Sequence, residues 1–337
     1  MIRVRCALLL AFLVYVVCAR PGRNSIVMTY IVRDEAVNIR SNLPLWATII
    51  DYFVFMVDER TSDGTESAIA EVLGSRIPYE IVYHRFEGFG SARTKSLANA
   101  WKYYPEATHV WIADPDWKPD LSTINKSDLD MVHDAFRFLI YDRNGISTRR
   151  CDWLLRHREG LAMRYHLHEV LDIGESYIPV TIPWVVHEIE QAGSWHTTVG
   201  HGHSMSAQRY VFDLEMLMKD VQLYGHDAHT HHYLGITHYA YAQKLMESNG
   251  YMITEEVAHH QQEAIKYLTK RVLSKYDDEF VEQRWSCMYA LGSLYAQYLV
   301  RPFLPLACYG VTIGRTTHIC RLCDSADVLV PFFRLIT

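Results

Sequence analysis

The sequence lacks an excess of basic residues, and it has few cysteines. It carries 33 lysine and arginine residues against 39 aspartate and glutamate residues, so its formal net charge is −6. Proteins that bind nucleic acid usually present a basic surface, and nucleic acid is therefore not an expected partner. Of the 7 cysteines, Cys6 and Cys18 lie in an N-terminal apolar run, and the others are odd in number and scattered. Such a set is no disulfide framework, although it leaves room for a single bridge.

The sequence also lacks an apolar run long enough to span a bilayer comfortably. The run at 6–19 follows two arginines and ends in the small-residue step Val17-Cys18-Ala19. It is shorter than the roughly 20 apolar residues of a membrane-spanning helix and is typical of a secretory signal peptide. We therefore expect residues 1–19 to be a signal peptide that takes the chain into the secretory pathway, to the ER or Golgi lumen or out of the cell. The alternative is an uncleaved signal anchor on a membrane, and the sequon at Asn125 weakly supports lumenal exposure.

Zinc-binding motifs are missing as well. The His-Glu pairs at 168–169 and 187–188 would form the motif H-E-x-x-H only if a histidine stood three residues after the glutamate. Asp172 and Gln191 stand there instead. The segment 320–323 (CRLC) is half of a zinc knuckle without a second pair. Five histidines further along the chain lack a carboxylate or thiol partner that would complete a metal site. They are His226, His229, His231, His232 and His238.

Strand-like and helix-like segments alternate along the first part of the chain. Strands are expected at 25–32, 51–57, 79–84 and 109–113, and helices at 35–50, 65–73 and 91–104. This alternation predicts an α/β fold, in which helices cover both faces of a sheet of parallel strands. Ligands of such sheets bind at the carboxyl ends of the strands.

Acidic side chains gather at that edge of the predicted sheet. They follow the first, second and fourth strands, in the segments Arg33-Asp34-Glu35, Asp58-Glu59-Arg60-Thr61-Ser62-Asp63-Gly64-Thr65 and Asp114-Pro115-Asp116. Each segment alone has a structural explanation, because Ser62 and Asp63 could cap the next helix and single acids often follow strands. Three segments at one edge favour a binding site. Asp114 and Asp116 repel each other, which indicates that they share a cation.

The same segments resemble a known enzyme family. The stretches "RDEAVNIRSNLPLW", "VDERTSDGT", "GFGSARTKSLANAW", "IADPDWKPD" and "RRCDWLLRHREGLAMRYHLHEVL" resemble family 2 glycosyltransferases of the GT-A fold, over residues 25–200. The resemblance implies a nucleotide-sugar-binding mixed sheet with helices on both faces. It also implies metal-dependent, inverting transfer of a hexose from a nucleotide-sugar donor, with a UDP-sugar expected, to a carbohydrate, lipid or protein acceptor. Glu59, Arg60 and Thr94 depart from the family pattern, which commonly has aspartate, glycine and asparagine there.

The resemblance places the donor at the acidic edge. It gives nucleotide-sugar-binding roles to Asp34, Glu35, Asp58, Asp63, Arg93, Asp114 and His168. Asp58 takes the nucleoside with Glu59 or Asp63 assisting, and His168 contacts the diphosphate or orients the general base. Arg93 and Lys95 add positive charge near the nucleotide, or else lie on a solvated helix face. The Gly88-Phe89-Gly90 segment before them is too short for a phosphate loop and is interpreted as a turn.

A metal site and a general base follow from the same resemblance. Asp116 is the main ligand of Mn²⁺ or Mg²⁺, and Asp114 contacts the ribose or the metal through water. His187 completes the site in this interpretation, and the alternative is a core or surface histidine. The ion would neutralise charge on the departing diphosphate. Glu169 is the expected base that takes the proton of the acceptor hydroxyl, with Asp172 as the fallback.

Beyond residue 202 the hydrophobic period becomes helical. Helices are expected at 205–223, 227–248, 254–275 and 278–300. The second and third resemble the paired helices of tetratricopeptide repeats, with Gly235 and Ala242 suited to close packing. The predicted organisation is a leader at 1–19, a GT-A domain at 25–200, a helical TPR-like region at 204–300 and an unassigned tail at 301–337. The helical region is expected to support binding of the acceptor or of a protein partner.

Two alternatives come from other classes of protein. A nucleotidyltransferase could share the sheet, but such enzymes usually have a glycine-rich loop with a basic residue after the first strand, and Val32-Arg33-Asp34-Glu35 is a poor match. A non-catalytic scaffold could display the helical region on an inactive sheet domain. A scaffold would not need Asp58, Asp114, Asp116 and Glu169 together.

Overall fold

The computed structural model describes residues 24–142, 145–146, 148–172, 179–189, 206–274 and 281–300 of the 337-residue chain. The predicted leader, the 301–337 tail and the CRLC segment lie outside the described residues. The chain divides into two compact units, Met1–Asp277 and Asp278–Thr337. Within the described part, no helix combines the length and the apolar character needed to cross a membrane. Cys151 and Cys287, the cysteines in that part, are both free thiols.

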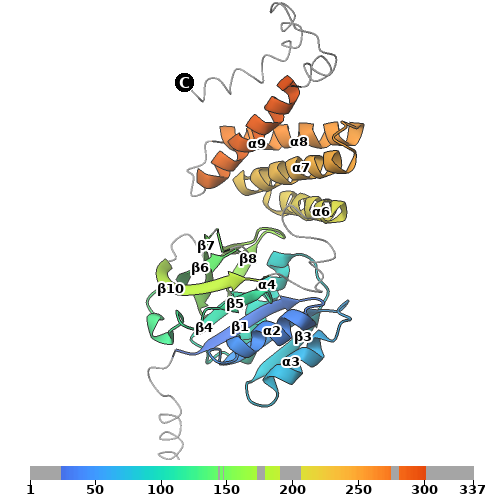
Figure 1. Ribbon diagram of the computed structural model, residues 1–337. Helices are drawn as coiled ribbons and strands as arrows, with labels where there is room; N and C mark the ends of the chain where they lie inside the picture. The colour runs from blue at the N-terminus through green and yellow to red at the C-terminus, as the bar shows by residue number, and fades with distance from the viewer. Residues whose placement is uncertain are drawn as a thin grey trace, which may run out of the picture. The chain divides into compact units, whose positions relative to one another are not determined.

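The core of the first unit is a mixed sheet with the strand order β3-β2-β1-β4-β7-β6-β10-β5 (Figure 1). Its strands are β1 (Ile26–Val32), β2 (Tyr52–Asp58), β3 (Tyr79–His84), β4 (His109–Ala113), β5 (Trp117–Pro119), β6 (Ala135–Tyr141), β7 (Thr148–Arg156) and β10 (Pro179–Glu188). A separate two-stranded sheet joins β8 (Ala162–Arg164) to β9 (Val170–Asp172). The four predicted strands are confirmed, and β3, β2, β1 and β4 run parallel. The sheet becomes mixed at β7, which runs antiparallel to both β4 and β6.

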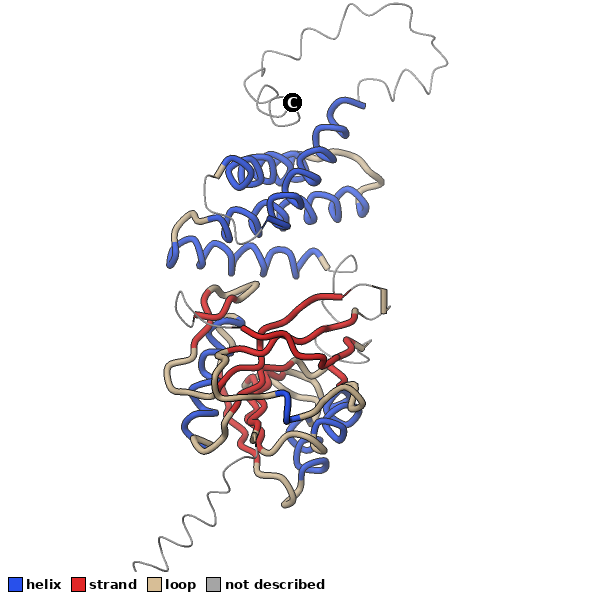
Figure 2. The backbone as a smooth tube through the Cα atoms, turned by 90° about the vertical axis from the view of Figure 1, so that its left-hand side faces the viewer, coloured by secondary structure: helices blue, strands red, loops and turns tan. Residues whose placement is uncertain are grey.

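Helices cover both faces of this sheet (Figure 2). The helices here are α2 (Ala36–Trp46), α3 (Thr65–Leu73) and α4 (Phe89–Tyr103), with a short 3₁₀ turn, η1, at Lys126–Asp128. Alternate residues of β1 point to opposite faces, so Met28 packs with α2 and α3 while Val27 packs with α4. The predicted helices are therefore present. Asn125 of the sequon is exposed, and its side chain accepts a hydrogen bond from the Ser127 amide in η1.

A long-range pairing holds the segment that follows β4. The short strand β5 lies antiparallel to β10, with Trp117 opposite Glu188. The amide of Ile189, just beyond β10, donates a 3.0 Å hydrogen bond to the carbonyl of Asp116. The backbone around Asp116 is thus fixed by residues much later in the sequence.

The four helices predicted beyond residue 202 are also present. They are α6 (Ala207–Tyr224), α7 (Ala228–Ser248), α8 (Glu255–Leu273) and α9 (Val281–Val300), and α9 belongs to the second unit. Ser206, Asp227 and Thr254 cap the first three. A Cβ at Gly235 would lie 2.6 Å from the Leu268 side chain, which confirms close packing of α7 on α8.

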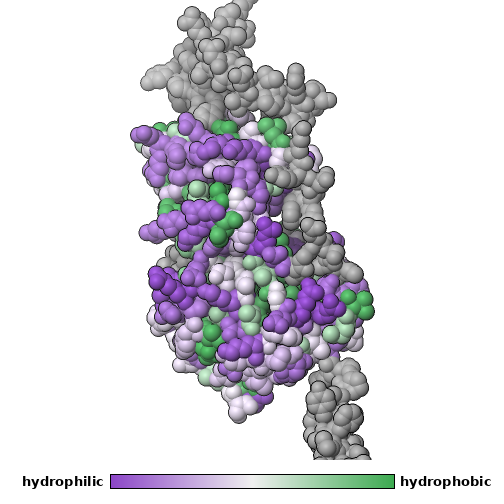
Figure 3. All heavy atoms as spheres, turned by 180° about the vertical axis from the view of Figure 1, so that it is seen from behind, coloured by the Kyte–Doolittle hydropathy of each residue, from purple (hydrophilic) through white to green (hydrophobic). Residues whose placement is uncertain are grey.

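The surface in Figure 3 is mostly polar, with hydrophobic side chains in small separate patches.

Candidate functional site

The candidate site lies where the strand order of the sheet reverses. From β1 the chain passes through α2 to β2 on one side, and it reaches β4 on the other side only after β3 and α4. Ligands of open α/β sheets bind in the crevice that such a reversal leaves at the carboxyl ends of the strands. Because β1 pairs with β4, the segments that begin with Arg33 and Asp114 leave the sheet next to each other.

Three carboxyl groups from these two segments influence one another. Glu35 is 3% exposed and Asp116 is 7% exposed. Burial, together with the negative charges of Asp116 and Asp114, raises the pKa of Glu35 to about 8, against a lowering effect of the Asn38 hydrogen bond. Glu35 is therefore protonated at neutral pH. The negative charges of Asp114 and Asp116 thus act on the buried Glu35 carboxyl and oppose its ionisation.

Polar side chains on the buried face of α2 hold this acidic site, and the sequence analysis did not identify them. The amide of Asn38 donates to Glu35 Oε2 at 2.6 Å, and the amide of Asn42 donates to the Pro115 carbonyl at 2.8 Å. One turn further on, the Trp46 indole N–H donates to the Trp117 carbonyl at 2.9 Å. Asn38 and Asn42 are four residues apart, so they share one face of the helix. The sequence does carry one signal for these residues, namely two asparagines at positions where the predicted helix faces the core.

Arg93 of α4 joins two of the predicted site residues. Its guanidinium forms an ion pair with Asp114 at 2.7 Å and a second with Glu169, and it lies 4.3 Å from the ring centre of Trp153. Burial opposes its charge, but Asp114 and Glu169 raise the pKa of Arg93 above its ordinary value. Arg93 is 4% exposed, so the alternative of a solvated helix face is wrong for this residue.

Lys95 lies on the exposed side of the same helix. Its side chain is 46% exposed and forms an ion pair with Glu87 at 2.8 Å. The solvated-face alternative therefore applies to Lys95. The Gly88-Phe89-Gly90 segment is also more than a turn, because Gly88 caps α4 and the helix begins at Phe89.

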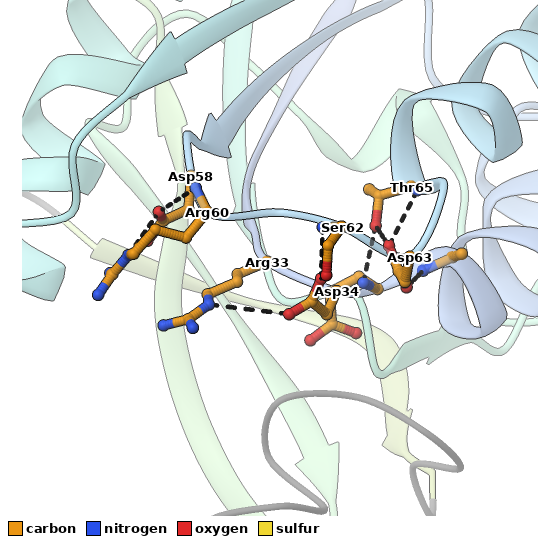
Figure 4. Close-up of polar contacts among 9 residues, drawn as sticks. Arg33, Asp34, Asp58, Arg60, Ser62, Asp63 and Thr65 are labelled. Atoms are coloured by element: carbon orange, nitrogen blue, oxygen red, sulfur yellow. Dashed lines mark hydrogen bonds and ion pairs between the residues drawn. The ribbon is translucent and has the colours of Figure 1, made fainter.

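The predicted nucleoside residue Asp58 is already bound by a neighbour (Figure 4). It is 3% exposed, and the Arg60 side chain donates to its Oδ1 at 2.9 Å and to its Oδ2 at 2.6 Å. Burial opposes ionisation, but the hydrogen bonds and charge of Arg60 lower the pKa of Asp58. Arg60 occupies the position where the resembling family commonly has glycine. Any nucleoside that uses Asp58 has to share or displace this guanidinium.

The other acids of the nucleoside side make local backbone contacts. Asp34 has a positive φ of 54° and accepts a 2.8 Å hydrogen bond from the Ser62 amide. Asp63 accepts from the amides of Thr65 and Ala36, at 3.0 Å and 2.8 Å. Asp63 thus ties together the first turns of α2 and α3, and both its oxygens are used, but the N-cap residue of α3 is Gly64.

Three further predicted residues, His187, Asp172 and His168, come from later parts of the chain. His187 stands opposite Lys118 in the β10–β5 pair, and its ring stacks on Tyr141 at 5.4 Å. Asp172 is exposed at the end of β9. The His168 ring stacks on Tyr233 of α7 at 3.7 Å, a contact that the sequence analysis did not anticipate. Among the residues that the structure describes, no three acidic, histidine or cysteine side chains are grouped so that they could hold a metal ion together.

The raised pKa of Glu35 predicts a pH-dependent stability. The unfolded-state pKa of a glutamate is about 4.3. Between that value and the folded-state pKa of about 8, the folded protein keeps a proton that the unfolded chain has lost, so the free energy of unfolding falls as pH rises. Glu35→Gln removes this dependence. We expect the stability of the variant, relative to the unmodified protein, to increase steadily from pH 5 to pH 8.

Urea unfolding at several pH values checks this expectation. Glu59→Gln is the matched control, because Glu59 is exposed on the next acidic segment. Parallel pH profiles for the unmodified protein and Glu35→Gln would show that Glu35 is ionised in the folded state.

Comparisons with known proteins leave the family open. No protein-family model matches the sequence, and no curated protein matches it significantly. Among solved structures, HddC from Yersinia pseudotuberculosis is similar over 50% of this chain and 92% of its own, with 12% sequence identity and a TM-score of 0.33. The structure itself shows an α/β fold built on a mixed sheet.

Proposed function

We propose that the protein is a metal-dependent, inverting glycosyltransferase of the GT-A fold with a TPR-like helical region. The donor is a nucleotide-sugar, with a UDP-sugar expected, and the acceptor is a glycan, lipid or protein. The observation that carries the proposal is the arrangement at the strand reversal. There Arg93 connects Asp114, one of the two carboxylates proposed to bind metal, with Glu169, the proposed general base.

The residues present fit a divalent cation. Mg²⁺ and related ions prefer oxygen ligands, and enzymes usually bind Mg²⁺ through one or two carboxylates, with water and substrate phosphates as the other ligands. Asp116 with Asp114 supplies two carboxylates, and their negative charges contribute, after burial, to the raised pKa of Glu35. Bound there, Mn²⁺ or Mg²⁺ would neutralise charge on the leaving diphosphate. His187 stays a proposed further ligand.

The protein's own groups divide the remaining work. Glu169 accepts the proton of the acceptor hydroxyl as that oxygen attacks the anomeric carbon. Arg93 fixes the position of the Glu169 carboxylate and neutralises part of the charge of Asp114. Asp58 and Arg60 provide polar groups for the nucleoside, at the end of β2.

Thermal-shift measurement with UDP and Mn²⁺ tests the proposal. We expect stabilisation when both are present and little with either alone, because the diphosphate and the carboxylates bind through a shared ion. Absence of stabilisation under all conditions would support the scaffold alternative. A screen of donor hydrolysis over UDP- and GDP-sugars then identifies the sugar.

Glu169→Gln is expected to keep donor binding and to lower turnover by about 10²-fold or more, the usual scale for loss of a general base. Glutamine is nearly isosteric with glutamate and still accepts a hydrogen bond from Arg93, but it cannot take a proton at neutral pH. Transfer rates and donor KM are measured for Glu169→Gln and Asp172→Asn side by side. An active Glu169→Gln with an inactive Asp172→Asn would move the base to Asp172.

A further inference from the structure

The four residues before Glu169 form a turn with an unusual backbone. In this turn, Tyr165 to His168, the φ angles of Tyr165 and His168 are 67° and 53°. Both values lie in the left-handed region, which residues with a Cβ rarely adopt. Such a conformation persists only where surrounding contacts hold it. Three helices, α4, α6 and α7, contact this turn.

Helix α4 holds the turn on one side. The Phe89 amide at the start of α4 donates a 2.8 Å hydrogen bond to the His166 carbonyl. A Cβ at Gly90 would overlap the carbonyl oxygen of Tyr165, so glycine is needed for this close approach. Arg93, the partner of Glu169, lies one helical turn further along α4.

Helix α6 holds the turn on the other side through one buried carboxylate. Asp220 is 0% exposed, and its Oδ1 lies 2.7 Å from both the backbone nitrogen and the Nδ1 of His166. Within the described part of the chain, its Oδ2 has no hydrogen-bond partner. A buried carboxylate committed to one residue restricts both the backbone and the side chain of that residue.

Helix α7 contacts the residues at both ends of the turn. The Tyr165 hydroxyl donates to Asp227 Oδ2 at 2.6 Å, and its ring stacks on His229 at 3.8 Å. The His168 ring stacks on Tyr233. Between them, Leu167 is buried in a hydrophobic cluster with Met216, Leu217, Leu234 and Tyr267.

We infer that α6 and α7 position the general base, and that Asp220 is the main positioning residue. Asp220 acts through His166 on the turn that leads into Glu169, and the Tyr165–Asp227 hydrogen bond supports it. The helical region is thus part of the catalytic unit, in addition to any role in binding a partner. The catalytic half of this inference rests on the proposed function.

Asp220→Asn tests the inference, with Tyr165→Phe as a second, nearly isosteric variant. Amide hydrogen exchange of the 165–169 segment should speed up by about tenfold or more, because a charge-assisted hydrogen bond is lost. Transfer turnover should fall by about 10²-fold, the scale for a misplaced catalytic group. Donor KM and the UDP–Mn²⁺ thermal shift should stay unchanged. Asp213→Asn is the matched control, because Asp213 is a buried acid on α6 that pairs with Arg209 of the same helix.

Each outcome decides one point. Unchanged exchange of 165–169 in both variants would overturn the inference. Faster exchange with unchanged turnover would show that the helices hold the turn without positioning the base, and the proposed function would stand. If the unmodified protein transfers no sugar from any donor, the proposed function and the catalytic half fail together, and exchange alone then decides whether Asp220 holds the turn.

Discussion

Asp116→Ala is expected to lower sugar transfer by about 10³-fold or more and to abolish metal-dependent nucleotide binding, while the fold stays intact. A metal ion that stabilises a leaving group contributes several kcal/mol to the transition state, and each 1.36 kcal/mol is a factor of ten in rate. The fold is expected to survive because the hydrogen bond from Ile189 uses the Asp116 backbone carbonyl. Removing the charge of Asp116 also removes one of the negative charges that raise the pKa of Glu35.

Transfer assays, the UDP–Mn²⁺ thermal shift and circular dichroism of the variant measure these effects. Asp120→Asn is the control, since Asp120 is an acid just beyond β5 that makes local hydrogen bonds to Ser122, which asparagine can also accept. Normal turnover by Asp116→Ala in chelator-treated buffer would contradict the metal role of this residue.

Arg93→Met is expected to destabilise the protein by about 3–5 kcal/mol, the range for breaking a buried ion pair by removing one partner. The substitution leaves the carboxylates of Glu169 and Asp114 without their shared cation, and the Glu169 side chain is 7% exposed. Methionine keeps much of the volume, so the loss reports charge more than packing. Transfer should also be lost, because the Glu169 carboxylate is no longer held.

Urea unfolding compares Arg93→Met with Lys95→Met, two residues further along α4. Lys95 pairs with Glu87 on the surface, and exposed pairs contribute little to stability. If the two substitutions lower the free energy of unfolding by the same amount, the buried ion pair contributes no more to stability than the exposed one. Adding Glu169→Gln to Arg93→Met should restore part of the stability, because it removes one of the unpaired charges.

The strands and helices could be predicted because their signals are local. The strand at 109–113 coincides with β4, and the helix at 65–73 coincides with α3. Both have continuous or periodic apolar positions and clear turn residues at their ends. The antiparallel direction of β7 could not be predicted in the same way. It depends on the pairing of β7 with β4 and β6, and a local sequence pattern does not show which strands pair.

The residues of the candidate site could be predicted better than the contacts between them. The family resemblance singled out Asp114, Arg93 and Glu169, but it did not indicate that Arg93 joins the other two. That connection needs α4, β4 and the segment before β9 to meet in three dimensions. The Asp220–His166 pair was missed for the same reason, since 54 residues separate the partners and Asp220 lies outside the stretches that carry the family resemblance.

The β5–β10 pair has a consequence for the order in which the protein becomes functional during synthesis. Domains fold from the N-terminus as the chain leaves the ribosome, and contacts between distant segments form late. The pairing of β1, β2, β3 and β4 involves residues up to Ala113, so it needs only the first third of the chain. The backbone at Asp116 can pair only after Glu188 and Ile189 have been synthesised. A nascent chain that stops between these points therefore has the surface around Asp58 while the Asp116 segment still lacks its partner strand.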